Sequence, residues 1–193
     1  LFNLPADNVE KIILYTLRVE SLNLLNDLLQ SPIPAEEIER NSINPAHIND
    51  LVSLTGSYSH DRNLILQIEN AVIGIVEAYP DKSKSVLILE DIISKSKSDT
   101  VSELTKTSIA IDALASAGEE GFASLLNIYP EAKVGRIKEL INRALLRFGY
   151  GLGKAIVNSQ IRKKLVGFIF ESPEGDRLAI NFLRALALAG MIR

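Results

Sequence analysis

Apolar side chains recur every three or four residues along nearly the whole chain, and this spacing restricts the fold more than any other feature. Such a recurrence is the period of one face of an α-helix. No run of alternating apolar and polar residues is long enough to predict a β-strand. The spacing therefore predicts an all-α protein. In the opening segment the series consists of Val9, Ile12, Ile13, Leu17, Leu24, Leu25 and Leu28.

Prolines and capping residues divide this pattern into ten or eleven predicted helices. All seven prolines are expected in gaps or first turns, where a missing amide hydrogen costs little. Asp7 is placed to cap the first helix and Pro32 to end it, and Asp61 is placed to cap a later one. After the opening helix, the predicted helices span residues 34–40, 45–55, 61–79, 84–95, 100–117, 119–128, 134–148, 152–159, 162–171 and 175–192.

The composition is that of a soluble globular protein whose length allows one domain or two small ones. The 193 residues are 47% hydrophobic and 23% charged. Zero cysteines exclude disulfides, thiolate zinc sites and cysteine nucleophiles, and they fit a reducing, cytoplasmic location. The longest apolar stretch, 178–192, is interrupted by Asn181 and Arg184 and is too short to span a membrane.

The formal net charge of −3 conceals a strong asymmetry along the chain. Residues 1–132 hold nine basic and 20 acidic side chains, a balance of −11. Residues 133–193 hold 12 basic and four acidic side chains, a balance of +8. Such a difference bears on binding partners and on self-association rather than on the fold.

Three predicted helices end on a similar pattern of Ala-Leu followed by a glycine five residues after the alanine. The three endings are Ala113–Gly118, Ala144–Gly149 and Ala185–Gly190. In each, the alanine allows a neighbouring helix to approach closely and the leucine fills the core. The glycine suits a helix end because it tolerates a positive φ.

One unit, residues 122–149, resembles a repeat of the HEAT/armadillo class. It contains Phe-Ala-Ser-Leu-Leu-Asn-Ile-Tyr-Pro-Glu-Ala-Lys, followed by a longer helix that ends in the Ala-Leu-Gly pattern. The resemblance implies a short right-handed α-solenoid of antiparallel helix pairs over residues 61–193. Residues 1–60 would form an irregular N-terminal helical cap within one continuous domain. An irregular helical bundle is the alternative, because alanine-rich helix contacts give the same endings.

No motif predicts a catalytic residue, a metal site or a cofactor. The glycine-rich run Gly149–Lys154 follows a helix rather than a strand, and Ala155 stands where a phosphate loop needs Ser or Thr. It is interpreted as a hinge. Ser57, Ser59, His60 and Asp61 include the residue types of a hydrolase triad, but near neighbours in sequence cannot form that relay. They are interpreted as a polar loop.

The strongest functional signal is a set of basic residues in the last third of the chain. Arg136, Arg143 and Arg147 fall within about 40° of one another on one helix, over roughly 16 Å. We call the full set the basic ridge. It consists of Arg136, Arg143, Arg147, Lys154, Arg162, Lys163 and Lys164.

The basic ridge predicts a non-enzymatic scaffold or adaptor whose partner is a protein with an acidic surface. The acidic end of a second copy could also bind it, which would give head-to-tail self-association. A nucleic-acid-binding HEAT-like protein that contacts phosphates through the same residues is the alternative. It is less favoured, because few aromatic residues lie among the basic ones to stack on bases.

Overall fold

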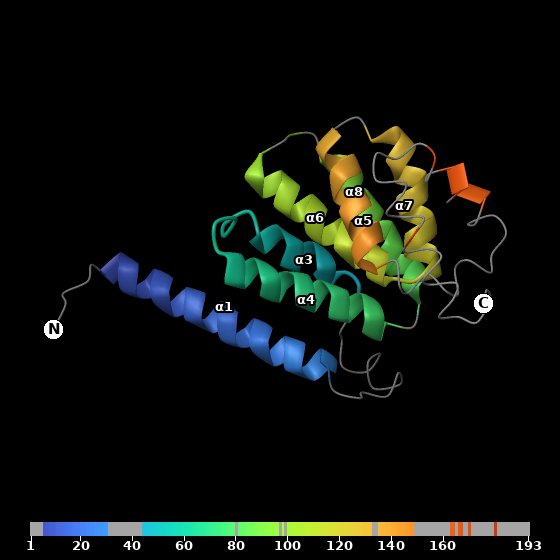
Figure 1. Ribbon diagram of the computed structural model, residues 1–193. Helices are drawn as coiled ribbons and strands as arrows, with labels where there is room; N and C mark the ends of the chain where they lie inside the picture. The colour runs from blue at the N-terminus through green and yellow to red at the C-terminus, as the bar shows by residue number, and fades with distance from the viewer. Residues whose placement is uncertain are drawn as a thin grey trace.

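The computed structural model describes residues 6–30, 44–79, 81–96, 98, 100–132, 135–148, 163–164, 166–167, 170 and 180. These residues form helices and loops without any strand, which confirms the prediction of an all-α protein (Figure 1). The predicted helices at 34–40 and 152–159 lie outside them. The helices are α1 (Ala6–Gln30), α3 (His47–Leu54), α4 (Arg62–Ala78), α5 (Lys82–Lys95), α6 (Val101–Ser116), α7 (Glu119–Glu131) and α8 (Gly135–Phe148).

The helices from α3 to α8 pack in two rows. One row contains α4, α6 and α8, and the other contains α3, α5 and α7. The long helix α1 lies along α4 at the edge of this assembly (Figure 1). None of the helices in the described ranges is both long and apolar enough to cross a membrane.

A single cluster of buried apolar side chains connects the helices. It extends from Leu22 of α1 and Ile48 of α3 to Leu145 of α8, on both sides of the predicted boundary at residue 60. The Ala-Leu pairs at the ends of α6 and α8 are fully buried, as their pattern predicts. These small and large side chains let α6 and α8 pack against each other.

Side-chain caps start several helices, because the first amides of a helix have no partner within it. The Asp61 carboxylate accepts a hydrogen bond from the Leu64 amide at 3.0 Å, which confirms its predicted capping role.

Helix α5 begins two residues earlier than predicted, at Lys82. The Lys82 ammonium donates to the carbonyl oxygens of Val76 and Glu77, at 2.6 and 2.7 Å, and so binds the end of α4. Burial lowers the pKa of this lysine.

Pro130 lies inside α7, so the prediction that every proline falls in a gap or a first turn is wrong. The predicted end of this helix at residue 128 is wrong as well, because α7 continues to Glu131. A proline removes the hydrogen bond to the carbonyl four residues earlier and crowds that carbonyl, so in the last turn it disturbs only the end of the helix. The Ala132 amide then closes the helix by donating to the Ile128 carbonyl at 3.0 Å.

Gly118 separates α6 from α7 and adopts a φ of 73°. Its position at the end of the first Ala-Leu-Gly pattern predicts this positive φ, which side chains with a Cβ rarely adopt. The glycines that end the other two patterns, Gly149 and Gly190, lie outside the described residues.

Candidate functional site

The structure places part of the basic ridge on the surface. Arg136 and Arg143 lie on α8 with side chains 63% and 60% exposed. Arg136 forms an ion pair with Glu139 of the same helix at 3.3 Å. The backbone of Arg147 belongs to α8, but its side chain lies outside the described part of the chain.

Of the remaining ridge residues, Lys163 and Lys164 are described and both are exposed. The Lys164 ammonium donates a hydrogen bond to the side-chain oxygen of Asn127, on α7. The predicted ridge residues Lys154 and Arg162 lie outside the described residues.

Arg143 also has a structural role that the sequence pattern does not reveal. Its guanidinium donates to the Ser108 hydroxyl at 2.7 Å and lies 3.8 Å from the Asp112 carboxylate. Both partners are on α6, and the Asp112 side chain is only 3% exposed. Arg143 therefore connects α8 to a buried acid on α6. The one available sequence signal was an acid within the apolar run 109–115.

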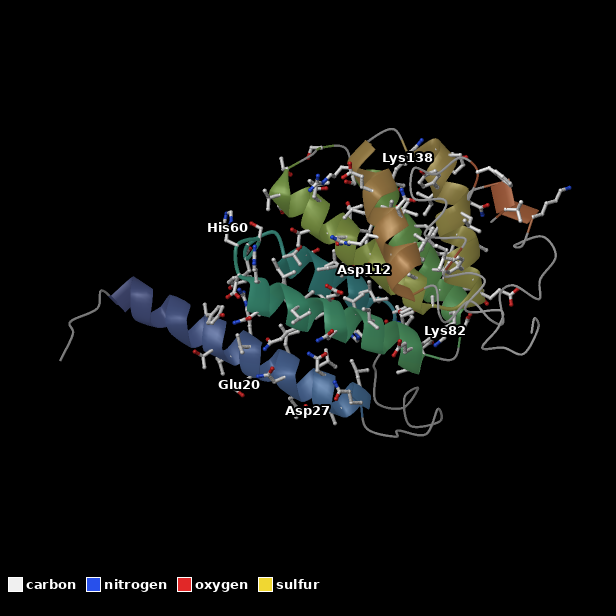
Figure 2. All side chains as sticks on the ribbon, in the orientation of Figure 1. Glu20, Asp27, His60, Lys82, Asp112 and Lys138 are labelled. Carbon is white, nitrogen blue, oxygen red and sulfur yellow. The ribbon has the colours of Figure 1, made fainter. Side chains whose placement is uncertain are left out.

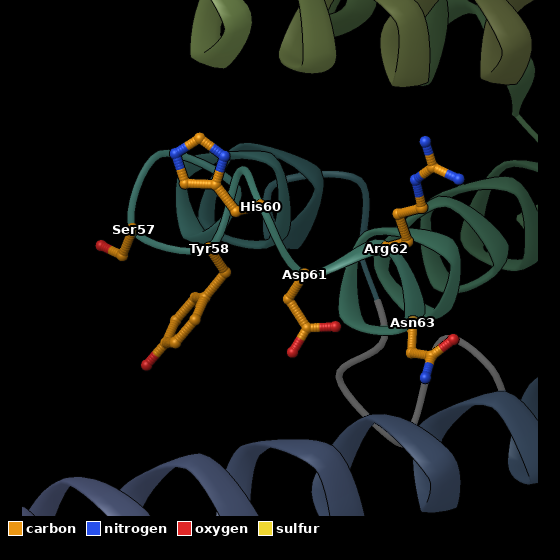
Figure 3. A pocket seen from close by; sticks show the side chains of 6 residues that line it. All are labelled: Ser57, Tyr58, His60, Asp61, Arg62 and Asn63. Atoms are coloured by element: carbon orange, nitrogen blue, oxygen red, sulfur yellow. The ribbon is translucent and has the colours of Figure 1, made fainter.

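An open hollow lies at the loop between α3 and α4 (Figure 3). His60 and Arg62 point to one side of this loop, whereas Tyr58 and Asp61 point to the other side, toward α1 (Figure 3). Asp61 accepts hydrogen bonds from the Leu64 amide and from the hydroxyl of Tyr15. The loop thus caps α4 and provides an attachment point for α1.

Four side chains, which we call the α1 latch, fix α1 to this loop: Tyr15, Arg18, Tyr58 and Asp61. The Tyr15 hydroxyl donates to Asp61 at 2.5 Å, and Arg18 donates to the Tyr58 hydroxyl. The Arg18 guanidinium also lies 5.4 Å from the centre of the Tyr58 ring, as in a cation–π contact. The paired residues are 46 and 40 positions apart, so local spacing gave no signal for the latch.

The latch shifts the titration of two of its members. The hydrogen bond from Tyr15 holds the pKa of Asp61 below its ordinary value of 3.8. The same hydrogen bond raises the pKa of Tyr15 above 10.0. The contribution of Asp61 to stability is therefore complete above pH 3.8 and is lost as the pH falls through its lower folded-state pKa. The contribution of Tyr15 to stability is complete below pH 10.0 and is lost as the pH rises through its higher folded-state pKa.

Replacing Tyr15 with phenylalanine is expected to raise the pKa of Asp61 toward 3.8, because the carboxylate loses its main hydrogen-bond donor. Carboxyl carbon chemical shifts followed by NMR across an acid titration measure this pKa directly. Tyr58→Phe serves as the control, because it removes a partner of Arg18 and leaves the bond between Tyr15 and Asp61. An unchanged Asp61 pKa in Tyr15→Phe would contradict the latch.

Helix α1 carries apolar residues on two sides, and the described part of the chain covers only one of them. Tyr15, Val19, Leu22, Leu25 and Leu29 pack against the core. Leu29 lies against Gly74 of α4, and a Cβ added to Gly74 would be only 2.9 Å from the Cδ1 of Leu29. A glycine at this point of α4 thus permits the close approach of α1.

The uncovered side of α1 carries what we call the leucine stripe. Leu14, Leu17, Leu24 and Leu28 are 45%, 58%, 62% and 46% exposed. At 100° per residue these four positions fall within an arc of about 80°. The apolar spacing of α1 was visible in the sequence, but it did not distinguish the covered leucines from the exposed ones.

The candidate functional site is therefore a surface rather than a pocket. It combines the leucine stripe on α1 with the exposed basic side chains at the opposite end of the helical assembly. Within the described ranges, no group of three or more His, Asp or Glu side chains is arranged to hold a metal ion. No protein-family model, curated protein or solved structure matches this chain.

Proposed function

We propose that this protein is a non-enzymatic scaffold or adaptor that binds other proteins through its helical surfaces. The leucine stripe carries this proposal. Single exposed leucines are ordinary, but four gather on one side of α1 over about 21 Å, two on each side of the exposed Ser21. Exposed apolar groups gathered in this way are typical of a protein-binding surface. The covered side of α1 holds the stripe in a fixed position on the core.

The proposed architecture is a short HEAT-like solenoid, with residues 1–60 as its N-terminal cap. The packing of the helices supports it, because from α3 onward each helix contacts mainly its next and next-but-one neighbours. In this proposal, the rows α4–α6–α8 and α3–α5–α7 are the two layers of stacked helix pairs. Stacked pairs present long surfaces to a partner, as a scaffold requires.

The basic ridge is the proposed second surface, for a partner with acidic groups. The exposure of Arg136, Lys163 and Lys164 supports this assignment. Phosphates of a nucleic acid would suit the same side chains, so the ridge needs a test that separates the two partners. A linear fall of the logarithm of affinity for random duplex DNA with the logarithm of salt concentration would favour nucleic acid.

The stripe variant Leu17→Asp/Leu24→Asp is expected to lose its protein partners, because charged groups cannot enter an apolar interface without a large desolvation cost. Cross-linking of tagged protein in cell extract, followed by quantitative mass spectrometry, measures this loss. We expect at least about a tenfold decrease in the proteins captured by the unmodified chain. Because both leucines are exposed, the helix content of the variant should not change.

Leu87→Asp provides the matched control. Leu87 is 64% exposed on α5 and does not belong to the stripe. The control should retain the captured proteins, whereas Arg136→Glu/Lys163→Glu/Lys164→Glu should lose those that bind the ridge. Capture of the same proteins at the same level by all four chains would refute the proposed function.

A further inference from the structure

Together with Ser21, the four leucines of the stripe have the spacing of a coiled-coil seam. Their intervals alternate between three and four residues, as do those of positions a and d in a heptad repeat. Their arc of about 80° is also narrower than the side of about 100° or more that a helix turns to a protein core. Such a seam accepts the side chains of one further helix between its own. The five positions are Leu14, Leu17, Ser21, Leu24 and Leu28.

The seam is held in one orientation before any partner binds. The covered side of α1 packs on α4 and includes Leu22, which is only 4% exposed. The α1 latch and the hydrogen bonds that join Asn23 and Asn26 to Gln67 of α4 oppose rotation of α1 about its axis. A partner helix therefore meets a preformed surface, and little conformational entropy is lost in ordering it.

The charge beside the seam is acidic. Glu20 is exposed, points away from α4 (Figure 2) and occupies the g position, which flanks the seam. Arg18, the one basic residue in the sequence from 14 to 30, lies on the other flank and donates to the Tyr58 hydroxyl. In the sequence, residues 1–60 contain three basic and eight acidic side chains, a balance of −5. Charge complementarity thus favours a basic partner.

A second copy of the seam does not meet this requirement. Two copies that face each other through their stripes bring together two segments with a balance of −5 each. In the antiparallel direction, pairing Leu14 with Leu28 places the two Ser21 residues at the centre. The two Glu20 carboxylates then lie on the same flank, within about one helical turn of each other along the axis. Like charges in this position oppose the pairing, so charge favours a different helix with basic residues.

We propose that the leucine stripe binds an amphipathic helix of another protein, which has apolar residues at its a and d positions and lysine or arginine beside them. The inference rests on the proposed function, because it names the chemistry of the partner that the stripe takes. The basic flank of the partner faces Glu20. A contact over about four turns makes a small interface, so we expect a dissociation constant on the order of 10 μM.

Two synthetic peptides test this partner chemistry. Each has about three heptads with leucine at a and d, and the basic peptide has lysine at e and g where the acidic peptide has glutamate. Lysine at both positions faces Glu20 whichever direction the peptide takes, because g lies beside e in parallel pairs and beside g in antiparallel pairs. Fluorescence anisotropy with the full chain should show that the basic peptide binds at least about tenfold more tightly than the acidic peptide.

Two variants of the protein locate the binding of the basic peptide. Leu17→Asp/Leu24→Asp should lose it, because charged groups cannot enter an apolar seam without a large desolvation cost. The two added carboxylates would instead increase any attraction that depends on charge alone. Leu87→Asp, which adds a carboxylate at an exposed position outside the stripe, should bind the basic peptide as the unmodified chain does.

Glu20→Lys should reduce the ratio of the two affinities by about threefold or more, because it reverses a charge that flanks the seam. Glu131→Lys is the matched control, since it makes the same change of charge at an exposed position on α7 and should leave the ratio unchanged. Because both peptides are measured on the same variant, a change in its stability affects both affinities alike. Equal ratios in these two variants would contradict the placement of the basic flank beside Glu20.

The remaining outcomes separate this inference from the proposed function. Binding of neither peptide, or equal binding of both, overturns the basic helix as the occupant. So does self-association of the unmodified chain in sedimentation velocity that Leu17→Asp/Leu24→Asp abolishes, because a second copy then occupies the stripe. In each case the proposed function still stands if this variant loses captured proteins, and it fails if the variant loses none.

Discussion

Replacing Gly121 with alanine is expected to lower the free energy of unfolding by about 3 kcal/mol. Gly121 lies in the first turn of α7, where that helix folds back against α6. An added Cβ would be 1.8 Å from the Leu114 carbonyl oxygen and 2.8 Å from the Ala117 Cβ. The carbonyl belongs to the backbone of α6 and cannot rotate away as a flexible side chain could. The two helices must therefore move apart, and the apolar contacts between them weaken.

Urea titration followed by circular dichroism measures this loss of stability. Gly135→Ala is the matched control, because Gly135 is also in the first turn of a helix and its added Cβ meets no atom within 4 Å apart from its chain neighbours and the backbone of its own helix. The control should change stability by no more than about 0.5 kcal/mol. Equal effects of the two substitutions would show that the close approach at Gly121 does not limit the packing of α6 against α7.

Replacing Arg143 with alanine is expected to lower the free energy of unfolding by about 2 kcal/mol. The change leaves the nearly buried Asp112 carboxylate without its cationic neighbour. Breaking a fully buried ion pair costs more, but the Arg143 side chain is 60% exposed, so water already screens part of the attraction. Urea titration of this variant measures the decrease in the free energy of unfolding, and so shows how much Arg143 contributes to holding α8 on α6.

Arg136→Ala is the control for this prediction. It removes the same type of residue from the same helix, but its partner Glu139 is 68% exposed. An exposed pair contributes little, so the control should change stability by less than about 0.5 kcal/mol. In a double-mutant cycle, Asp112→Asn and Arg143→Ala should show a coupling energy of about 1 kcal/mol. Additive effects would mean that the two side chains do not interact.

The two roles of Arg143 affect how the basic ridge can be tested. Reversing its charge would place a like charge beside Asp112 and would perturb the contact between α6 and α8 as well as any partner binding. Arg136 pairs with Glu139 of α8, Lys164 donates to Asn127 of α7 and Lys163 is exposed, so none of the contacts described for these three residues involves this acid. Substitutions at these three positions therefore report on binding with less effect on the fold.

The helices of this protein were largely predictable because their signals are local. A spacing of three or four residues, a capping acid such as Asp61 and a glycine such as Gly118 all act within one or two helical turns. The error at Pro130 has the same origin. A proline normally predicts a break, but the end of α7 tolerated it because the cost depends on the position within the helix.

The candidate site was less predictable because its parts come from separate helices. The basic residues could be counted from the sequence, but the buried acid beside Arg143 and the latch partners of Tyr15 and Arg18 could not be located. Each of these contacts joins side chains that only the folded chain brings together. The exposure of the leucine stripe was unpredictable for the same reason, because it depends on which side of α1 packs against α4.

The sequence by itself thus determined that the chain is helical, where most described helices begin and how its charge is distributed. The tertiary structure decided which side of each helix is covered. Helix α1 has apolar residues on two sides, but it can place only one of them against α4, where Gly74 allows a close approach to Leu29. The α1 latch fixes that choice and leaves the leucine stripe in solvent. The local spacing of apolar residues makes the segment helical, whereas contacts between residues distant in the sequence decide which side of the helix faces the core.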